Sequence, residues 1–143
     1  MIKKNSYSKQ GKINRQSGAK FELKVRENLE KDNWIIDKWT NNVDLENKKL
    51  VKAKRKFNPF MKILGIGTGF PDFIGFKLLN KNKYEIIGIE VKKNGYLDKS
   101  EREKCKWLLD NKIFSKILIA KSIKDGKRIN IEFIDFKDKY KVQ

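Results

Sequence analysis

The spacing of apolar residues along the chain predicts an α/β domain. Phe21, Val25 and Leu29 recur with the period of a helix, which we expect to begin at about Ser17 as its N-cap. Later apolar runs, rich in Ile, Val and aromatic residues, are typical of strands. The runs predict strands over 34–39, 70–79, 84–92, 115–123 and 129–136, with a second helix from Asp98 or Ser100 to about Asn111. This order predicts a central mixed sheet with helices packed against it.

The chain divides into a short basic arm and one larger unit. Its first twenty residues carry lysine and arginine but no acidic residue, so we expect residues 1–16 to form a flexible arm that contacts phosphate groups. Residues 17–143 fit a single domain that is large enough to bury a core. Within it, residues 40–68 are rich in lysine and lack regular alternation, which predicts an irregular basic insertion loop.

Residues 70–92 are the most informative segment, because two apolar runs flank the polar turn 80–83 as in a β-hairpin. Pairing about this turn sets Asp72 opposite Glu90. Lys92 then lies on the same face as Glu90, since side chains alternate along a strand. A slip of one residue would separate the two carboxylates. The same register pairs Ile74 with Gly88, Phe76 with Ile86, and Lys77 with the oppositely charged Glu85.

Two neighbouring carboxylates repel each other unless a positive charge lies between them. Oxygen ligands suit a hard divalent cation such as Mg²⁺, for which Mn²⁺ can substitute, and such a cation keeps waters that a phosphate can replace. The ammonium of Lys92 beside it could orient a water or stabilise charge on a phosphate. This set indicates metal-assisted phosphodiester hydrolysis. The alternative interpretation is that Asp72 ends a turn after Pro71, and that Glu90 and Lys92 lie at a frayed strand edge.

The charge of the chain indicates a polyanionic partner. The formal net charge is +17 and the pI is near 9.9, which favours nucleic acid over a membrane surface. Residues 48–56 concentrate basic side chains just before several aromatic residues, a pattern suited to gripping a backbone. An ordinary solvated loop would give the same pattern. The residues expected to contact nucleic acid are Lys48, Lys49, Lys52, Lys54, Arg55, Lys56 and Lys93.

Residue types that are scarce exclude several classes of protein. The chain has no histidine, which excludes Ser-His-Asp and Cys-His hydrolases and zinc sites built on histidine. The single Cys105 excludes an internal disulfide and is expected to be a core residue. No apolar run is long enough to span a bilayer, and no apolar stretch follows the basic start, so we expect no secretion signal and an intracellular location.

The element order, with Pro71-Asp72 on the second strand and Glu90-Val91-Lys92 on the third, resembles the PD-(D/E)xK nuclease superfamily, whose core is restriction-endonuclease-like (αβββαβ). Residues 69–72 and 90–92 are most similar to virus-type replication-repair nucleases (VRR-NUC). Residues 18–22, followed by Trp34 at the start of a strand, resemble archaeal Holliday-junction resolvases. The resemblance implies that Asp72 and Glu90 bind Mg²⁺, with a ligand from the main-chain carbonyl of Val91. It also implies that Lys92 assists the attacking water and that Glu22 is an accessory acid.

The expected function is therefore a metal-dependent endonuclease acting on DNA, on branched, nicked or flapped structures. The alternatives are a non-catalytic nucleic-acid-binding protein that keeps the nuclease fold, or an RNA nuclease.

The chain departs from the VRR-NUC pattern in the second predicted helix. In VRR-NUC domains the helix after the Glu-x-Lys strand usually carries a Gln a few residues before a Trp. Here Trp107 is present, but the candidate places hold Glu101, Glu103 and Lys104. The resolvases act as two-fold dimers, and we expect a homodimer through the apolar residues of the last strands: Ile129, Ile131, Phe133 and Phe136. Packing under the second helix is the alternative for these four.

Overall fold

The computed structural model describes the backbone of residues 2–53, 56–58, 63–65 and 69–141, and the side chains of residues 9–53 and 69–141. Three helices are described: α1 (Ile2–Lys31), α2 (Lys99–Asp110) and α3 (Phe136–Tyr140). The strands are β1 (Ile35–Lys38), β2 (Asn41–Asp44), β3 (Lys49–Lys52), β4 (Lys56–Asn58), β5 (Ile63–Gly65), β6 (Phe73–Asn80), β7 (Lys83–Val91), β8 (Lys116–Asp125) and β9 (Arg128–Asp135).

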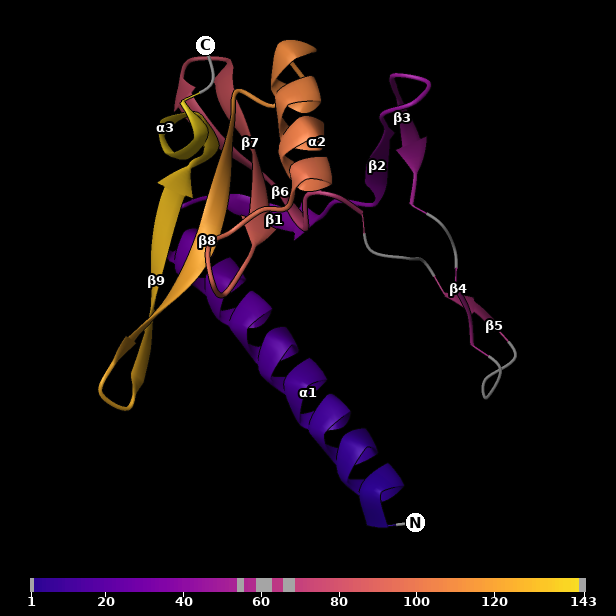
Figure 1. The fold of residues 1–143 in the computed structure, drawn as a ribbon. Helices are drawn as coiled ribbons and strands as arrows, with labels where there is room; N and C mark the ends of the chain where they lie inside the picture. The colour runs from indigo at the N-terminus through magenta and orange to yellow at the C-terminus, as the bar shows by residue number, and fades with distance from the viewer. Residues whose placement is uncertain (1, 54–55, 59–62, 66–68, 142–143) are drawn as a thin grey trace.

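A five-stranded mixed sheet forms the centre of the molecule, in the order β1-β6-β7-β8-β9 (Figure 1). All neighbours are antiparallel except β7 and β8. Parallel neighbours need a crossover connection, and α2 supplies it. The prediction of an α/β fold with a central mixed sheet and packed helices is therefore confirmed.

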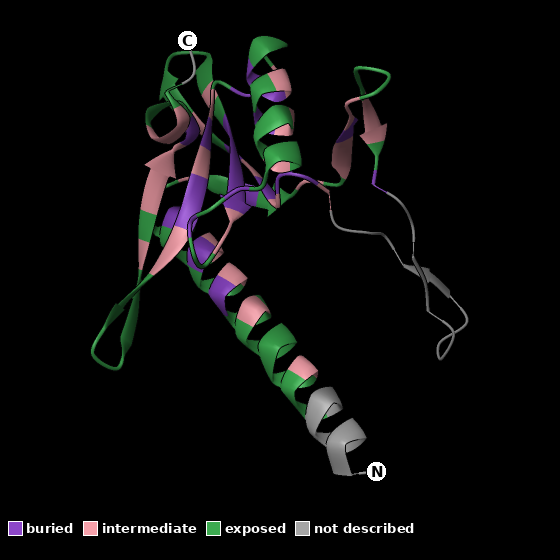
Figure 2. Cartoon of the chain, in the orientation of Figure 1, coloured by how far each residue is buried: buried purple, intermediate pink, exposed green. Residues whose placement is uncertain are grey.

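Each face of the sheet buries its own cluster of apolar side chains (Figure 2). On one face, the predicted stripe of Phe21, Val25 and Leu29 on α1 packs against residues that include Ile87 and Ile89 of β7. On the other face, the buried side of α2 packs against β8 and α3; this cluster includes Cys105, Leu108, Leu109, Phe114, Ile117, Ile119 and Phe136. The end of β7 thus lies between the two clusters, and both α1 and α2 pass close to it.

The first helix corrects the predicted basic arm, because α1 begins at Ile2 rather than near Ser17. Residues 2–16 contain no proline and no run of β-branched residues that would stop a helix. One turn is linked by side chains, since Gln10 Nε2 donates to Asn14 Oδ1 at 3.1 Å. The predicted start of the helix near Ser17 was therefore wrong, and the basic residues expected on a flexible arm belong to a helix. The division of the chain into an arm and a domain stays a prediction.

The predicted insertion over residues 40–68 also holds regular structure. β2 and β3 pair as an antiparallel hairpin, and β4 and β5 as another. The turn of the first hairpin is fixed by Asp44, whose carboxylate accepts bonds from the main chain and the side chain of Asn47 at 3.1 and 2.9 Å. Asp and Asn are turn formers for this reason. Val43 and Ala53 are buried, so this hairpin packs onto the domain and is not an irregular loop.

Three of the four residues expected at the dimer surface are buried or partly buried. Phe136 is buried in the α2 cluster, and Ile131 and Phe133 are partly buried against the α1 cluster. Of the four residues, Ile129 alone is exposed. The homodimer stays a prediction, but most of the surface expected to form it is covered. Among the helices described, none combines the length and the apolar composition needed to cross a membrane.

Candidate metal centre

The hairpin of β6 and β7 brings Asp72 and Glu90 together in the predicted register. Ile74 pairs with Gly88, and Phe76 with Ile86, which confirms the pairing inferred from the turn. Lys77 also lies opposite Glu85. However, Lys77 Nζ lies 3.7 Å from the Asp32 carboxylate, and the Glu85 carboxylate lies 3.0 Å from Lys116 Nζ. The register therefore comes from the apolar pattern and the turn rather than from the Lys77–Glu85 pair.

Asp72 is held in place by its own packing and by the main chain of β7. Pro71 is fully buried, and it lies over Gly88: a Cβ on Gly88 would approach Pro71 Cγ to 2.8 Å. Asp72 Oδ2 accepts a hydrogen bond of 2.8 Å from the backbone N–H of Val91. The missing side chain at position 88 thus lets the segment carrying Asp72 lie directly against the strand that carries Glu90.

The carbonyl group of Val91 is directed towards the same place. Main-chain groups of alternate β7 residues bond to β8, as Lys92 N does to Ala120 O at 3.0 Å. Those of Val91 therefore point the other way, towards the β6 side, where Asp72 accepts from its N–H. Pro71, which precedes Asp72 on that side, has no N–H that it could donate to the Val91 carbonyl.

Glu90 is the only charged side chain among the buried residues described, at 4% exposure. Its Oε1 has no hydrogen-bond partner in the described part of the chain. Burial raises the pKa of Glu90 to about 10, and the hydrogen bond and the negative charge of Asp72 add to the effect. Buried polar atoms almost always have partners, and a buried carboxylate without a cation is costly. A cation beside this oxygen would satisfy it and would offset the repulsion between Glu90 and Asp72.

Glu22 of α1 lies beside this pair, although it comes from the opposite end of the sequence. Burial raises the pKa of Glu22, the charge of Asp72 raises it further, and Lys38 opposes the shift. Glu22 and Val91 also line one cavity of about 370 Å³, together with Asn14, Ser17, Gly18, Phe21 and Lys93. The structure thus brings Glu22 to the edge of the Asp72–Glu90 site, as the resemblance implies.

Lys92 reaches the site but is engaged by an acid that sequence reasoning did not assign. Lys92 Nζ lies 2.6 Å from Glu101 Oε2 on α2. Partial burial lowers the pKa of Lys92, but the hydrogen bond to Glu101 and the charges of Glu90, Glu101 and Asp72 outweigh it, so the pKa is raised. Glu101 also completes a capping box with Asp98, the N-cap of α2. The Asp-x-x-Glu spacing signals this cap, but it does not reveal the contact with Lys92.

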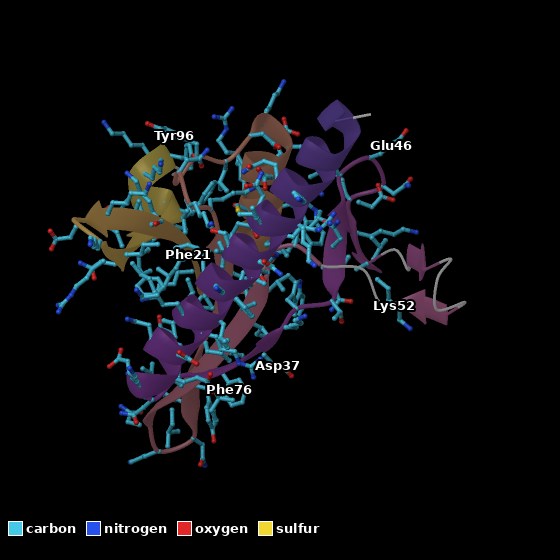
Figure 3. The ribbon with its side chains drawn as sticks, turned by 90° about the horizontal axis from the view of Figure 1, so that it is seen from below. Phe21, Asp37, Glu46, Lys52, Phe76 and Tyr96 are labelled. Carbon is cyan, nitrogen blue, oxygen red and sulfur yellow. The ribbon has the colours of Figure 1, made fainter. Side chains whose placement is uncertain are left out.

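The predicted nucleic-acid contacts lie in two places. Lys48, Lys49 and Lys52 are exposed on the β2–β3 hairpin, and Figure 3 shows Lys52 on the side of the molecule away from Tyr96. The side chains of Lys54, Arg55 and Lys56 lie outside the described residues. Lys93 lies instead against α1, where its Nζ donates to Ser17 Oγ at 2.5 Å. The predicted residues therefore do not form one surface.

The arrangement fits a hard divalent cation with an incomplete protein shell. Within the residues that the structure describes, no three acidic, cysteine or histidine side chains form a metal-binding group on their own. Two carboxylates, one of which has a buried oxygen without a partner among the described residues, and the Val91 carbonyl suit Mg²⁺, which usually keeps several waters. Comparisons of the chain with models of known protein families, with curated proteins and with solved structures found no match.

Proposed function

We propose that this protein is a Mg²⁺- or Mn²⁺-dependent endonuclease that hydrolyses phosphodiester bonds in DNA, of the PD-(D/E)xK type and most similar to the VRR-NUC and resolvase-like groups. The observation that carries the proposal is the buried Glu90 oxygen, which has no partner among the residues that the structure describes and lies beside Asp72 and the Lys92 ammonium. Burying Glu90 beside Asp72 lowers the stability of the folded protein. A cation-binding function would explain why the two acids are nevertheless kept together.

Asp72, Glu90 and the Val91 carbonyl are the groups that would hold the cation. A bound divalent cation supplies a Lewis acid for a phosphoryl oxygen and lowers the pKa of a coordinated water. Glu22, which lines the cavity beside Val91, is placed to orient a water through its carboxylate. Lys92 is placed to stabilise negative charge on the phosphate, because its ammonium stands next to both site acids.

Charge supports nucleic acid as the substrate. A net charge of +17 steers a polyanion to the surface and contributes affinity through counterion release. Asp72, Glu90 and Glu22 lie close together, so their negative charge disfavours binding of phosphate unless a cation neutralises them. The combination therefore favours a metal-dependent enzyme over a protein that only binds.

The test compares cleavage of plasmid DNA and of synthetic flapped and branched DNA in Mg²⁺ by the wild type and by Asp72→Asn. The amide keeps an oxygen that can accept from Val91 N–H, but it removes the ligand charge. We expect at least a 100-fold loss of activity, with the fold retained by circular dichroism. Glu132→Gln, which neutralises an exposed acid on β9, is the matched control and should cleave as the wild type does. Equal cleavage by Asp72→Asn would contradict the proposal.

One observation favours the non-catalytic alternative: the Lys92 ammonium is already paired with Glu101 at 2.6 Å. A protein that only binds nucleic acid would retain binding in EDTA and would cleave nothing under Mg²⁺ or Mn²⁺. Matched DNA and RNA substrates, assayed side by side, separate the deoxyribonuclease that we propose from an RNA nuclease.

A further inference from the structure

A second cavity lies between α1 and the β8–β9 hairpin. Its volume is about 560 Å³. Residues of one helix face form its α1 side, since they recur three or four positions apart; they are Ile13, Gln16, Ser17, Lys20, Phe21 and Lys24. Lys93, Ser122, Lys124 and Ile129 form the other side. In Figure 1 the C-terminal part of α1 passes behind β8 and β9, and the helix and the hairpin diverge below this crossing.

The chemistry of this groove suits a polyanion with apolar parts. Its lining includes four lysines and no acid, and none of these lysines takes part in an ion pair within the described residues. Between them stand Ile13 and Ile129, both exposed. Exposed apolar side chains within a basic groove match a sugar–phosphate backbone, which presents charged and apolar groups in alternation.

The groove leads to the acids. It shares Ser17, Phe21 and Lys93 with the 370 Å³ cavity that Glu22 and Val91 line, so the two cavities adjoin. Lys93 stands at their junction, where its Nζ donates to Ser17 Oγ. A strand lying in the groove would therefore arrive at the Asp72–Glu90 site along α1.

We infer that the groove between α1 and the β8–β9 hairpin binds a single strand of nucleic acid that leads into the acidic site. This inference rests on the proposed function and names its substrate: a flap or an unpaired end. The volume of the groove, about 560 Å³, lies in the range of roughly 300–1,000 Å³ typical of sites that enclose a small molecule, so it has room for a short stretch of a single strand but not for a duplex. The phosphates of a single strand in this groove would lie within reach of Lys20, Lys93 and Lys124, and its sugars would contact Ile13 and Ile129.

The first experiment measures binding of a labelled oligothymidylate, about 16 nucleotides long to cover known site sizes, by fluorescence anisotropy in EDTA. The triple variant Lys20→Ala, Lys93→Ala, Lys124→Ala should bind at least tenfold more weakly. Its log affinity should fall with log salt at a slope flatter by about 2, since each lost contact removes about 0.7. The control triple Lys83→Ala, Lys106→Ala, Lys137→Ala removes the same charge from exposed positions outside the groove and should change affinity by less than threefold.

Equal losses in the two triples would overturn the inference, because net charge alone would then explain binding. Equally tight binding of a polyglutamate peptide of the same charge would also overturn it, in favour of a general acidic partner. Cleavage is measured separately. If the wild type binds through the groove but does not cleave, the proposed function is contradicted and the groove inference is not. If the wild type cleaves but the groove triple binds oligothymidylate as well as the control triple does, the groove inference is contradicted and the proposed function is not.

The second experiment locates the strand without measuring affinity. The one native thiol, Cys105, is buried, so an introduced cysteine can be labelled selectively with a maleimide. Ile129→Cys lies in the groove, and Ile86→Cys is its control on β7; both isoleucines are 41% exposed. Saturating oligothymidylate in EDTA should slow labelling at position 129 at least fivefold and leave position 86 unchanged. Equal labelling rates with and without the oligonucleotide at position 129 would overturn the inference.

Discussion

At the scale of single residues, the chemistry of the site depends on the burial of the Glu90 carboxyl group. Glu90 is buried, its Oε1 lacks a partner among the described residues, and Asp72 lies against it. Without a cation, the pair is easiest to hold in the folded state when it shares a proton. The protein should therefore exchange a proton for a metal ion as the site fills.

The first prediction is a dependence of stability on pH in EDTA. The pKa of Glu90 is raised from 4.5 to about 10, so the folded state holds a proton that the unfolded state releases within this window. The free energy of unfolding should then be highest at low pH and fall as the pH rises, by at most about 1.4 kcal/mol per pH unit from this group. Urea denaturation at several pH values inside the window measures the slope.

Glu90→Gln should flatten that slope, whereas Glu132→Gln, at an exposed site, should leave it unchanged. At the alkaline end of the window, Mg²⁺ should raise the thermal midpoint of the wild type, because a ligand that binds only the folded state stabilises it. The increase should be much smaller for Glu90→Gln. Parallel pH slopes for the wild type and Glu90→Gln would contradict the assignment of a buried proton to this residue.

The second prediction concerns Lys92 and the acid that holds it. Glu101 raises the pKa of Lys92 through a direct hydrogen bond. Glu101→Gln removes the charge and keeps the capping box, because Gln serves as well as Glu at N3. The pKa of Lys92 should fall, and the alkaline limb of the cleavage rate should move to lower pH, with little change in the thermal midpoint.

Lys92→Ala should remove that alkaline limb and lower kcat/KM at least 100-fold. Glu103→Gln is the matched control, since it neutralises an exposed acid on the same helix. A pH–rate profile unchanged by Glu101→Gln would show that Lys92 does not titrate in the reaction.

The sequence predicted the positions of Asp72, Glu90 and Lys92 because the side-chain period of a strand and one polar turn determine them. Glu101 could not be assigned in this way. It comes from the helix that follows, and its distance from Lys92 depends on how α2 packs across the sheet. The raised pKa of Glu22 likewise depends on the approach of α1 to Asp72, which no local pattern encodes.

At the scale of elements, local signals succeeded where they were strong and failed where they were weak. The β6–β7 register and the range of α2 follow from alternation, from a turn and from the cap at Asp98. The start of α1 was missed because residues 2–16 offer few apolar positions from which to read a helical period. β2 was missed because it has a single apolar residue, and β3 because its two apolar residues are adjacent and flanked by lysines. The short α3 gives too little pattern to read.

The third prediction tests how the hairpin positions Asp72. A Cβ at position 88 would approach Pro71 Cγ to 2.8 Å and Phe114 Cδ2 to 3.1 Å. Gly88→Ala should therefore displace Pro71 and cost about 1–3 kcal/mol of stability. Because Asp72 follows Pro71 directly, cleavage and Mg²⁺ binding should fall as well, beyond what the loss of folded protein explains.

Gly11→Ala is the control for Gly88→Ala. A Cβ on Gly11 would meet nothing within 4 Å, and alanine in a helix interior is favoured over glycine by roughly 0.5–1 kcal/mol. This variant should be as stable as the wild type or more so, with full activity. If Gly88→Ala folds and cleaves as the wild type does, Pro71 does not position the site.

At the scale of the whole molecule, the positive charge is distributed over separate surfaces. One lies along the groove between α1 and β8–β9, close to the acids. Another lies on the β2–β3 hairpin, with Lys48, Lys49 and Lys52. A substrate with both a single-stranded and a double-stranded part would use both surfaces, the groove for its unpaired strand and the hairpin for its duplex. Flapped DNA has this form.

The last prediction separates the two surfaces by the substrate that each one binds. If 6–8 phosphates of a duplex are contacted, log affinity should fall with log salt at a slope of roughly −5 to −7. Replacing Lys52, Lys54, Arg55 and Lys56 with alanine should flatten the duplex slope by up to about 3.6, since each lost contact removes about 0.9, and should leave oligothymidylate binding nearly unchanged. A control with Lys31, Lys83, Lys106 and Lys137 replaced removes equal charge from other exposed positions. Equal flattening in both would show that the 48–56 run is an ordinary solvated segment, and that duplex binding follows net charge alone.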